Sequence, residues 1–135
     1  MYHVARLEEK EVTVPRVVHF EISADDPDRA VAFYQSVFGW QIDKWNGSAD
    51  YWLITTGGEP EPGIDGAIQR RQAPSEHITD VIDVPSIDEY VDKVQSHGGQ
   101  IVLPKMAVPG VGYVAYFCDT EGNVFGMMQA DPDAK

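Results

Sequence analysis

The stretch VVHFEI at residues 17–22 places two chemically capable side chains close together. β-branched and aromatic residues in such a short run are typical of a strand. Because successive side chains of a strand point to opposite faces, His19 and Glu21 share one face, and Phe20 and Ile22 share the other. An imidazole beside a carboxylate can bind a metal ion, contact a substrate or move a proton, and it can also simply face water.

The charge of the chain argues against two classes of partner. Acidic residues outnumber basic ones by 22 to 10, which gives a formal net charge of -12. A field of this sign repels phosphate groups, so we expect neither nucleic acid nor an anionic membrane as a partner. The same field slightly favours cationic ligands and metal ions.

Two further features bear on the compartment of the protein. No apolar run approaches the roughly 20 residues that span a bilayer, and residues 1–15 mix both charge signs without an apolar signal-peptide core. We therefore expect a cytoplasmic protein. Cys118 is the only cysteine, which excludes an intrachain disulfide and a CxxC metal site.

The elements that position His19 and Glu21 follow from the rest of the first half. We expect a strand at 17–24 and then a helix in DDPDRAVAFYQSVFGW, with Asp25 or Asp26 as its N-cap and Gly39 at its end. Three strand-like runs follow, WQIDKW, YWLITT and GAIQRR, separated by the turn-rich segments NGSAD and GGEPEPGIDG. The predicted order is βαβββ.

The second half repeats this order. HITDVIDV predicts a strand, and SIDEYVDKVQSHGG predicts a helix in which Ser86 and Glu89 have the spacing of a capping box. QIVLPKMAV, GYVAYFCD and NVFGMMQ predict three more strands. The two halves align without gaps at an offset of 60 residues, so that GAIQ at 66–69 matches GMMQ at 126–129. We interpret the chain as an internal duplication.

This duplicated pattern resembles the vicinal oxygen chelate superfamily, which includes glyoxalases, extradiol dioxygenases and bleomycin-resistance proteins. The matching stretches are HFEISADDPDRAVAFYQSVFGW, IDVPSIDEYVDKVQSHGGQIV and FCDTEGNVF. The resemblance implies an α+β fold in which two tandem βαβββ modules form a cupped, eight-stranded mixed β-sheet with the helices outside. It divides the chain into an N-terminal extension (1–15), one domain (16–130) built of two repeats (16–71 and 76–130), and a C-terminal tail (131–135).

In metal-using members, the resemblance implies a divalent ion inside the cup, held by ligands from the first and last strand of each half. Here the first ligand position falls on His19, but its repeat mate is Thr79, which is a poor ligand. The last-strand positions fall on Gly126 and its mate Gly66, which have no side chain. One of four expected ligands remains, so we expect no cofactor, while a divalent metal ion stays open if other residues supply ligands.

The set that stays open is His19, Glu21 and His77, which has the composition of a two-histidine, one-carboxylate iron site. Strand parity places Glu21 on the face of His19, and His77 on the face of Thr79. The spacing counts against this set, because residues i and i+2 lie roughly 6.5–7 Å apart along a strand and both must reach one ion.

A cup without metal ligands suggests a small-molecule site. Gly66 and Gly126 would leave room where metal-using relatives project a glutamate, and apolar residues such as Ile68 would line the wall. The predicted ligand-contacting residues come from both halves: His19, Glu21, Trp52, Thr79, Tyr113, Gly126 and Met128.

The leading hypothesis is a small-molecule-binding protein of the glyoxalase/bleomycin-resistance group that lacks the usual metal site and binds an unknown small molecule. The resemblance also implies a homodimer, and it leaves open whether the protein is an enzyme. The alternative is a metal-dependent glyoxalase-like lyase or dioxygenase with non-standard ligands around His19. Two further hypotheses are sequestration of a cationic drug, which the negative charge permits, and an interaction module with a filled core.

Overall fold

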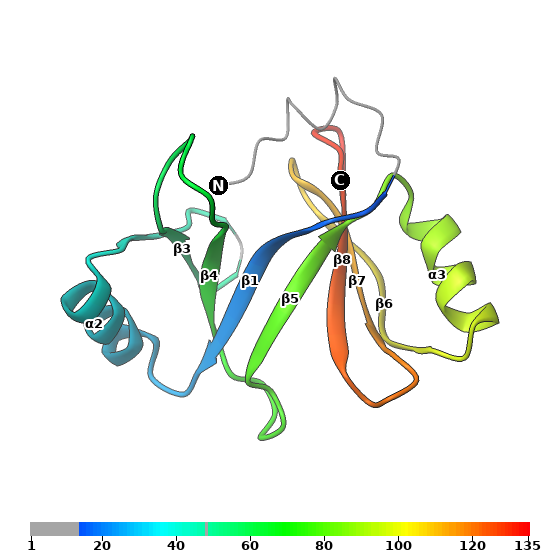
Figure 1. The fold of residues 1–135 in the computed structure, drawn as a ribbon, viewed down its shortest axis with the longest axis horizontal. Coiled ribbons are helices and arrows are strands. Elements are labelled where there is room, and N and C mark those ends of the chain that lie inside the picture. The colour runs from blue at the N-terminus through cyan, green and yellow to red at the C-terminus, as the bar shows by residue number, and fades with distance from the viewer. Residues whose placement is uncertain (1–13, 48) are drawn as a thin grey trace. The chain divides into compact units, whose positions relative to one another are not determined.

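The structure is a computed structural model that describes residues 14–47 and 49–135 (Figure 1). This part of the chain forms eight strands and two helices, with both parallel and antiparallel strand pairs, which confirms the predicted α+β class and mixed sheet. The chain divides into two compact units. The first contains residues 18–79, and the second contains residues 80–135 together with the short segment 14–17. The predicted N-terminal extension lies almost wholly outside the described residues, and the cup expected between the units stays a prediction.

The first half has the predicted βαβββ order. Its elements are β1 (Val17–Ala24), α2 (Pro27–Phe38), β2 (Gln41–Lys44), β3 (Tyr51–Thr55) and β4 (Asp65–Arg70). The strands lie in the order β2-β3-β4-β1, with β1 parallel to β4 and the other pairs antiparallel. This topology places β3 and β4 beside the strand that carries His19 and Glu21.

The second half repeats this topology. Its elements are β5 (Ile78–Asp83), α3 (Ile87–Ser96), β6 (Gln100–Val108), β7 (Gly112–Cys118) and β8 (Val124–Ala130). The strands lie in the order β5-β8-β7-β6, with β5 parallel to β8 and the other pairs antiparallel.

Both helices begin at residues that the sequence predicts as caps, and α2 ends at the predicted glycine. The Asp26 side chain accepts the Arg29 main-chain N–H at 3.1 Å, and the Ser86 hydroxyl accepts that of Glu89 at 3.2 Å. Each of these bonds satisfies one of the N–H groups that a helix leaves unpaired at its start. Gly39 ends α2 in the left-handed region, with φ of 70°.

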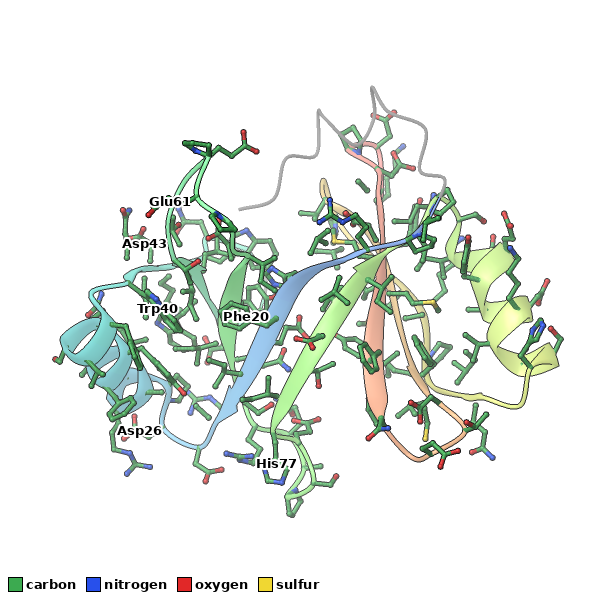
Figure 2. The ribbon with its side chains drawn as sticks, in the orientation of Figure 1. Phe20, Asp26, Trp40, Asp43, Glu61 and His77 are labelled. Atoms are coloured by element: carbon green, nitrogen blue, oxygen red, sulfur yellow. The ribbon has the colours of Figure 1, made fainter. Side chains whose placement is uncertain are left out.

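Each unit has its own hydrophobic core between its helix and one face of its strands. The core beside α2 contains Trp52, Ile54 and Ile68. Phe20 and Trp40 pack against this core, and the centroids of their two rings lie 6.0 Å apart (Figure 2). The core beside α3 has the buried residues Val84, Ile87, Ala115 and Met127. Because the helices cover these faces, residues of alternate parity lie on the face opposite the helix in each unit. No helix in the described part of the chain is long and apolar enough to span a membrane.

Candidate functional site

Three hydrogen-bonded side chains lie on the face of the first unit opposite α2. The hydroxyl group of Tyr51 in β3 donates to Oε2 of Glu21 at 2.9 Å, and it lies 3.1 Å from Nε2 of His19. Since one hydroxyl group contacts both β1 side chains, the prediction that His19 and Glu21 share a face is confirmed. We call this group the His–Tyr–Glu cluster.

Burial determines the protonation state of His19. The residue is 9 % exposed, and desolvation lowers the pKa of His19 to about 4 from its ordinary value of 6.5. The imidazole is therefore neutral at pH 7. Because the single hydroxyl proton of Tyr51 goes to Glu21, the hydroxyl oxygen accepts the proton of His19 Nε2, and this pattern assigns the Nε2–H tautomer.

Two further side chains lie beside the cluster. Asp65 in β4 is the register partner of His19. Burial alone would raise the pKa of Asp65, but the main-chain N–H and hydroxyl of Thr56 donate to its Oδ1 at 2.9 and 3.3 Å and help to hold that pKa below its ordinary value. The ring of Trp45 contacts that of Tyr51 edge to face, with centroids 6.0 Å apart.

The chemistry of the cluster follows from the hydrogen-bond donors and acceptors of its three side chains. A neutral imidazole, a phenol and a carboxylate offer both donors and acceptors, as the polar wall of a small-molecule site requires. The Glu21 carboxylate can also serve as a general base, because it already accepts a proton-bearing group at hydrogen-bond distance.

Two predicted ligand-contacting residues lie on the other faces of the sheets. Trp52 is 9 % exposed and packs in the core beside α2. Tyr113 packs against the core beside α3. The amino group of Lys105 lies over the Tyr113 ring and forms an ion pair with Asp88 of α3. The sequence did not assign a parity to β3 and β7, and the structure places both aromatic rings on the faces that pack against the helices.

The strand registers show which positions of the two halves correspond. The paired residues in one row across β1, β4 and β3 are Glu21, Ala67 and Leu53. The corresponding row across β5, β8 and β7 consists of Val81, Gly126 and Tyr116. Ala67 rather than Gly66 is therefore the counterpart of Gly126. The uniform offset of 60 residues is wrong for the last strands, where the offset is 59.

Neither glycine leaves the open space that the sequence suggested. A Cβ on Gly126 would lie 2.9 Å from the ring of Tyr116, so that ring occupies the space above this glycine. A Cβ on Gly66 would lie 2.5 Å from the ring and the carbonyl oxygen of Phe20, and Gly66 shares the α2 face with Ile68. The prediction of a site widened at these two glycines, with Ile68 on its wall, is corrected accordingly.

Comparisons with known proteins agree with this fold. A family model for the N-terminal part of bleomycin-resistance-like proteins matches residues 16–57. CFP32 of Mycobacterium tuberculosis, which is provisionally described as a glyoxylase, is 29 % identical over 115 residues, covering 82 % of this chain and 44 % of CFP32. The chain thus spans less than half the length of the curated relatives it matches.

Solved structures share this fold. Methylmalonyl-CoA epimerase from Mycobacterium tuberculosis has a TM-score of 0.64 at 15 % identity, covering 86 % of this chain and 88 % of the other. A glyoxalase/bleomycin resistance protein/dioxygenase superfamily member from Vibrio splendidus has a TM-score of 0.59 at 17 % identity. This match covers 86 % of this chain and 99 % of the other. At these identities the solved structures show that the chain shares their fold.

The ligand positions that the resemblance implies do not carry a complete set of chelating side chains in either half of this chain. In the first unit, the two candidate ligands His19 and Glu21 are joined through Tyr51, and the last-strand position is Ala67. In the second half, the corresponding positions are Thr79 and Gly126. Within residues 14–47 and 49–135, no three His, Cys, Asp or Glu side chains are arranged to hold a metal.

His77 does not complete the proposed three-residue set. It is exposed and precedes β5, and its carbonyl oxygen accepts the main-chain N–H of Ser23 at 2.8 Å. Figure 2 shows it at the end of β1 that contains Ser23. Since Ser23 lies four residues beyond His19, the two histidines are separated by about 13 Å along the strand. The structure therefore does not bring His77 together with His19 and Glu21.

Sequence reasoning missed several residues on the faces opposite the helices, above all Tyr51, Tyr116 and Asp83. One signal could have found Tyr51. Ile42 is the one aliphatic side chain in β2, and it pairs with Ile54 in the adjacent hairpin strand. Directly opposed residues share a face, so Ile54 faces the core and Tyr51 the opposite side. Of the remaining predicted residues, Met128 and Thr79 share the parity of Gly126 and Asp83 and lie opposite α3.

Proposed function

We propose that this chain is a small-molecule-binding member of the glyoxalase/bleomycin-resistance group whose His–Tyr–Glu cluster contacts the ligand by hydrogen bonds and holds no chelated metal ion. One observation carries the proposal: the Tyr51 hydroxyl group is hydrogen-bonded to Glu21 and lies at hydrogen-bond distance from His19. Both candidate chelating side chains thus lie at hydrogen-bond distance from one phenol, which supports a hydrogen-bonding role for them.

The wall around the cluster supports a small organic ligand. Leu53 and Ala67 occupy the row beside Glu21, and the Trp45 ring contacts Tyr51. A mostly apolar surface with a few convergent polar groups is the usual form of a small-molecule site. A ligand with a carbonyl or hydroxyl oxygen suits this surface, because its oxygen can exchange hydrogen bonds with the phenol and imidazole.

Metal analysis tests the absence of a chelated ion. The full chain is purified without chelator and without a nickel-binding tag, and its divalent metal content is measured before and after incubation with Mn²⁺, Fe²⁺, Co²⁺, Ni²⁺ and Zn²⁺. We expect far less than one ion per chain in wild type. A stoichiometric ion that is lost in His19→Ala would overturn the proposal and favour the metal-dependent lyase or dioxygenase.

Ligand binding is tested by a thermal-shift screen of oxygenated metabolites against wild type and two variants. We expect hits to lose at least about tenfold in affinity in Tyr51→Phe and Glu21→Gln, as loss of a hydrogen bond to a charged group does. Tyr113→Phe is the matched control, because that ring packs beside α3. Equal losses in Tyr51→Phe and Tyr113→Phe would contradict a ligand site at the cluster.

A metal-independent proton-transfer enzyme is the second candidate. The supporting observation is the Tyr51–Glu21 hydrogen bond, which keeps a buried carboxylate beside a group that can carry a proton. Such an enzyme would take a proton from carbon next to a carbonyl. Exchange of that hydrogen in D₂O, followed by NMR over a panel of 2-oxo compounds and thioesters, should be catalysed by wild type and lost in Glu21→Gln.

A further inference from the structure

Asp83, the last residue of β5, carries a buried carboxylate with no hydrogen-bond partner among the residues that the structure describes. The residue is 4 % exposed, and neither side-chain oxygen accepts a hydrogen bond from any residue in 14–47 or 49–135. Its main-chain N–H is satisfied by the carbonyl oxygen of Arg16 at 2.9 Å, so only the side chain is left without a partner. Buried carboxylates are nearly always paired, and an exception calls for an explanation.

The side chains beside Asp83 on this face of β5, β8 and β7 carry no hydrogen-bond donor. Asp83 pairs with Met128 of β8, which pairs with Val114 of β7, and Val81 precedes Asp83 on the same face of β5. None of these three side chains carries an N–H or O–H group. Burial among them raises the pKa of the Asp83 carboxyl to about 6, so the ionised form still predominates at pH 7.5.

The fold itself does not need a carboxylate at this position. The corresponding residue in the first half is Ser23, which ends the same row in β1 beside Gln69 and Tyr51. Asp83 also caps no helix, since the N-cap of α3 is Ser86. Neither strand pairing nor helix capping therefore accounts for this buried carboxylate.

We propose that Asp83 is the anchor of a binding site for an organic ammonium ion, on the face of β5, β8 and β7 opposite α3. An ionised carboxylate only accepts hydrogen bonds, and a protonated amine only donates them. The apolar side chains of Val81 and Met128 suit the hydrocarbon part of such a ligand. The net charge of -12 raises the local concentration of cations and disfavours anionic competitors.

Benzylamine, which is cationic at pH 7.5, and its neutral analogue benzyl alcohol test this site on the full chain. Binding is followed by calorimetry and by the ¹³C carboxyl resonance of Asp83. We expect benzylamine to bind saturably and to shift that resonance, and benzyl alcohol to do neither. Asp83→Asn should weaken the binding of benzylamine at least about tenfold, because it removes the charge from the hydrogen-bonding group.

Asp92→Asn is the matched control, since Asp92 is an exposed residue of α3 and its loss changes the net charge equally. We expect this variant to bind benzylamine as wild type does. If both variants bound benzylamine equally weakly, the effect would come from the net charge of the protein, and the proposed site would be overturned. Absence of benzylamine binding up to about 10 mM, or equal binding of benzyl alcohol, would also overturn it. Circular dichroism of Asp83→Asn shows whether the variant is folded.

This inference is independent of the proposed function. The metal analysis and the Tyr51→Phe binding assay do not involve Asp83, and the benzylamine assay does not involve the His–Tyr–Glu cluster. Either proposal can therefore fail while the other stands.

Discussion

Corresponding rows in the two halves of this protein contain different chemistry. In the first half the row across β1, β4 and β3 consists of Ser23, Gln69 and Tyr51, and Tyr51 bonds to Glu21. In the second half the same row consists of Asp83, Met128 and Val114, and the Asp83 carboxylate has no partner among the described residues. The first half thus pairs its buried polar groups with each other, whereas the second half buries a lone charge.

The difference shows which parts of a duplicated unit are constrained. The faces that pack on α2 and α3 are apolar in both halves, because each helix needs an apolar surface against which to bury its own apolar stripe. The opposite faces carry no such requirement, so the two halves differ there. The chemistry of a duplicated unit therefore has to be determined separately for each copy.

The largest difference in stability between the two halves should come from alanine substitution of Gly66 and of Gly126. Gly66→Ala should cost about 3 kcal/mol or more, because its Cβ would lie 2.5 Å from the main-chain oxygen of Phe20, which cannot rotate away. Gly126→Ala should cost only about 1 kcal/mol, since the edge of the Tyr116 ring can shift. Urea unfolding at pH 7 measures both. Equal costs would contradict the different surroundings of the two glycines.

Lowering the pH should decrease the free energy of unfolding, because His19 is harder to protonate in the folded chain than in the unfolded chain. The folded-state pKa of His19 is lowered from 6.5 to about 4, so the unfolded chain binds the proton more readily between these values. This contribution to stability is complete above pH 6.5, and up to about 3 kcal/mol is lost as the pH falls to 4. The stability of His19→Gln should lack the part of this pH dependence that comes from His19. Urea unfolding from pH 4 to 8 gives the difference, and parallel pH profiles for the two proteins would contradict it.

Asp83 should have the opposite pH dependence. Its folded-state pKa is raised from 3.8 to about 6, so the folded chain binds the proton more readily, and stability falls as the pH rises through this range. Asp83→Asn should stabilise the chain by about 2 kcal/mol above pH 6, with the gain vanishing below pH 3.8. Asp92→Asn serves as the control of equal charge. A loss of stability in Asp83→Asn at pH 7 would show that the carboxylate is paired in solution.

The smallest effect should come from the phenol of the cluster. Tyr51→Phe should cost about 1–2 kcal/mol, because buried hydrogen-bonding groups of Glu21 and His19 lose their shared partner. Tyr113→Phe should change stability by less than about 0.5 kcal/mol, since its ring packs beside α3 and makes no hydrogen bond in the described structure. Thermal unfolding of the two variants at pH 7 distinguishes these effects, and equal losses would count against the cluster.

Several parts of the candidate site were predictable and others were not. Alternation in β1 correctly placed His19 and Glu21 on one face, because Phe20 and Ile22 are clearly apolar. In β3 the run YWLIT is apolar or aromatic at four of five positions, so alternation alone does not distinguish Trp52 from Tyr51. The error on Trp52 followed from that ambiguity, and only the pairing of Ile42 with Ile54 resolves it.

The sequence by itself determined the duplicated βαβββ order, a helix cap at Ser86 and one at Asp25 or Asp26, and the placement of an imidazole and a carboxyl group on one face of β1. These features depend on local periodicity and on hydrogen bonds between residues close in the chain. The tertiary structure alone decided that Tyr51 joins His19 to Glu21, that aromatic rings fill the space at both glycines, and that Asp83 lacks a partner. Those outcomes depend on strand register, and a shift of one residue between the last strands changes which side chains meet.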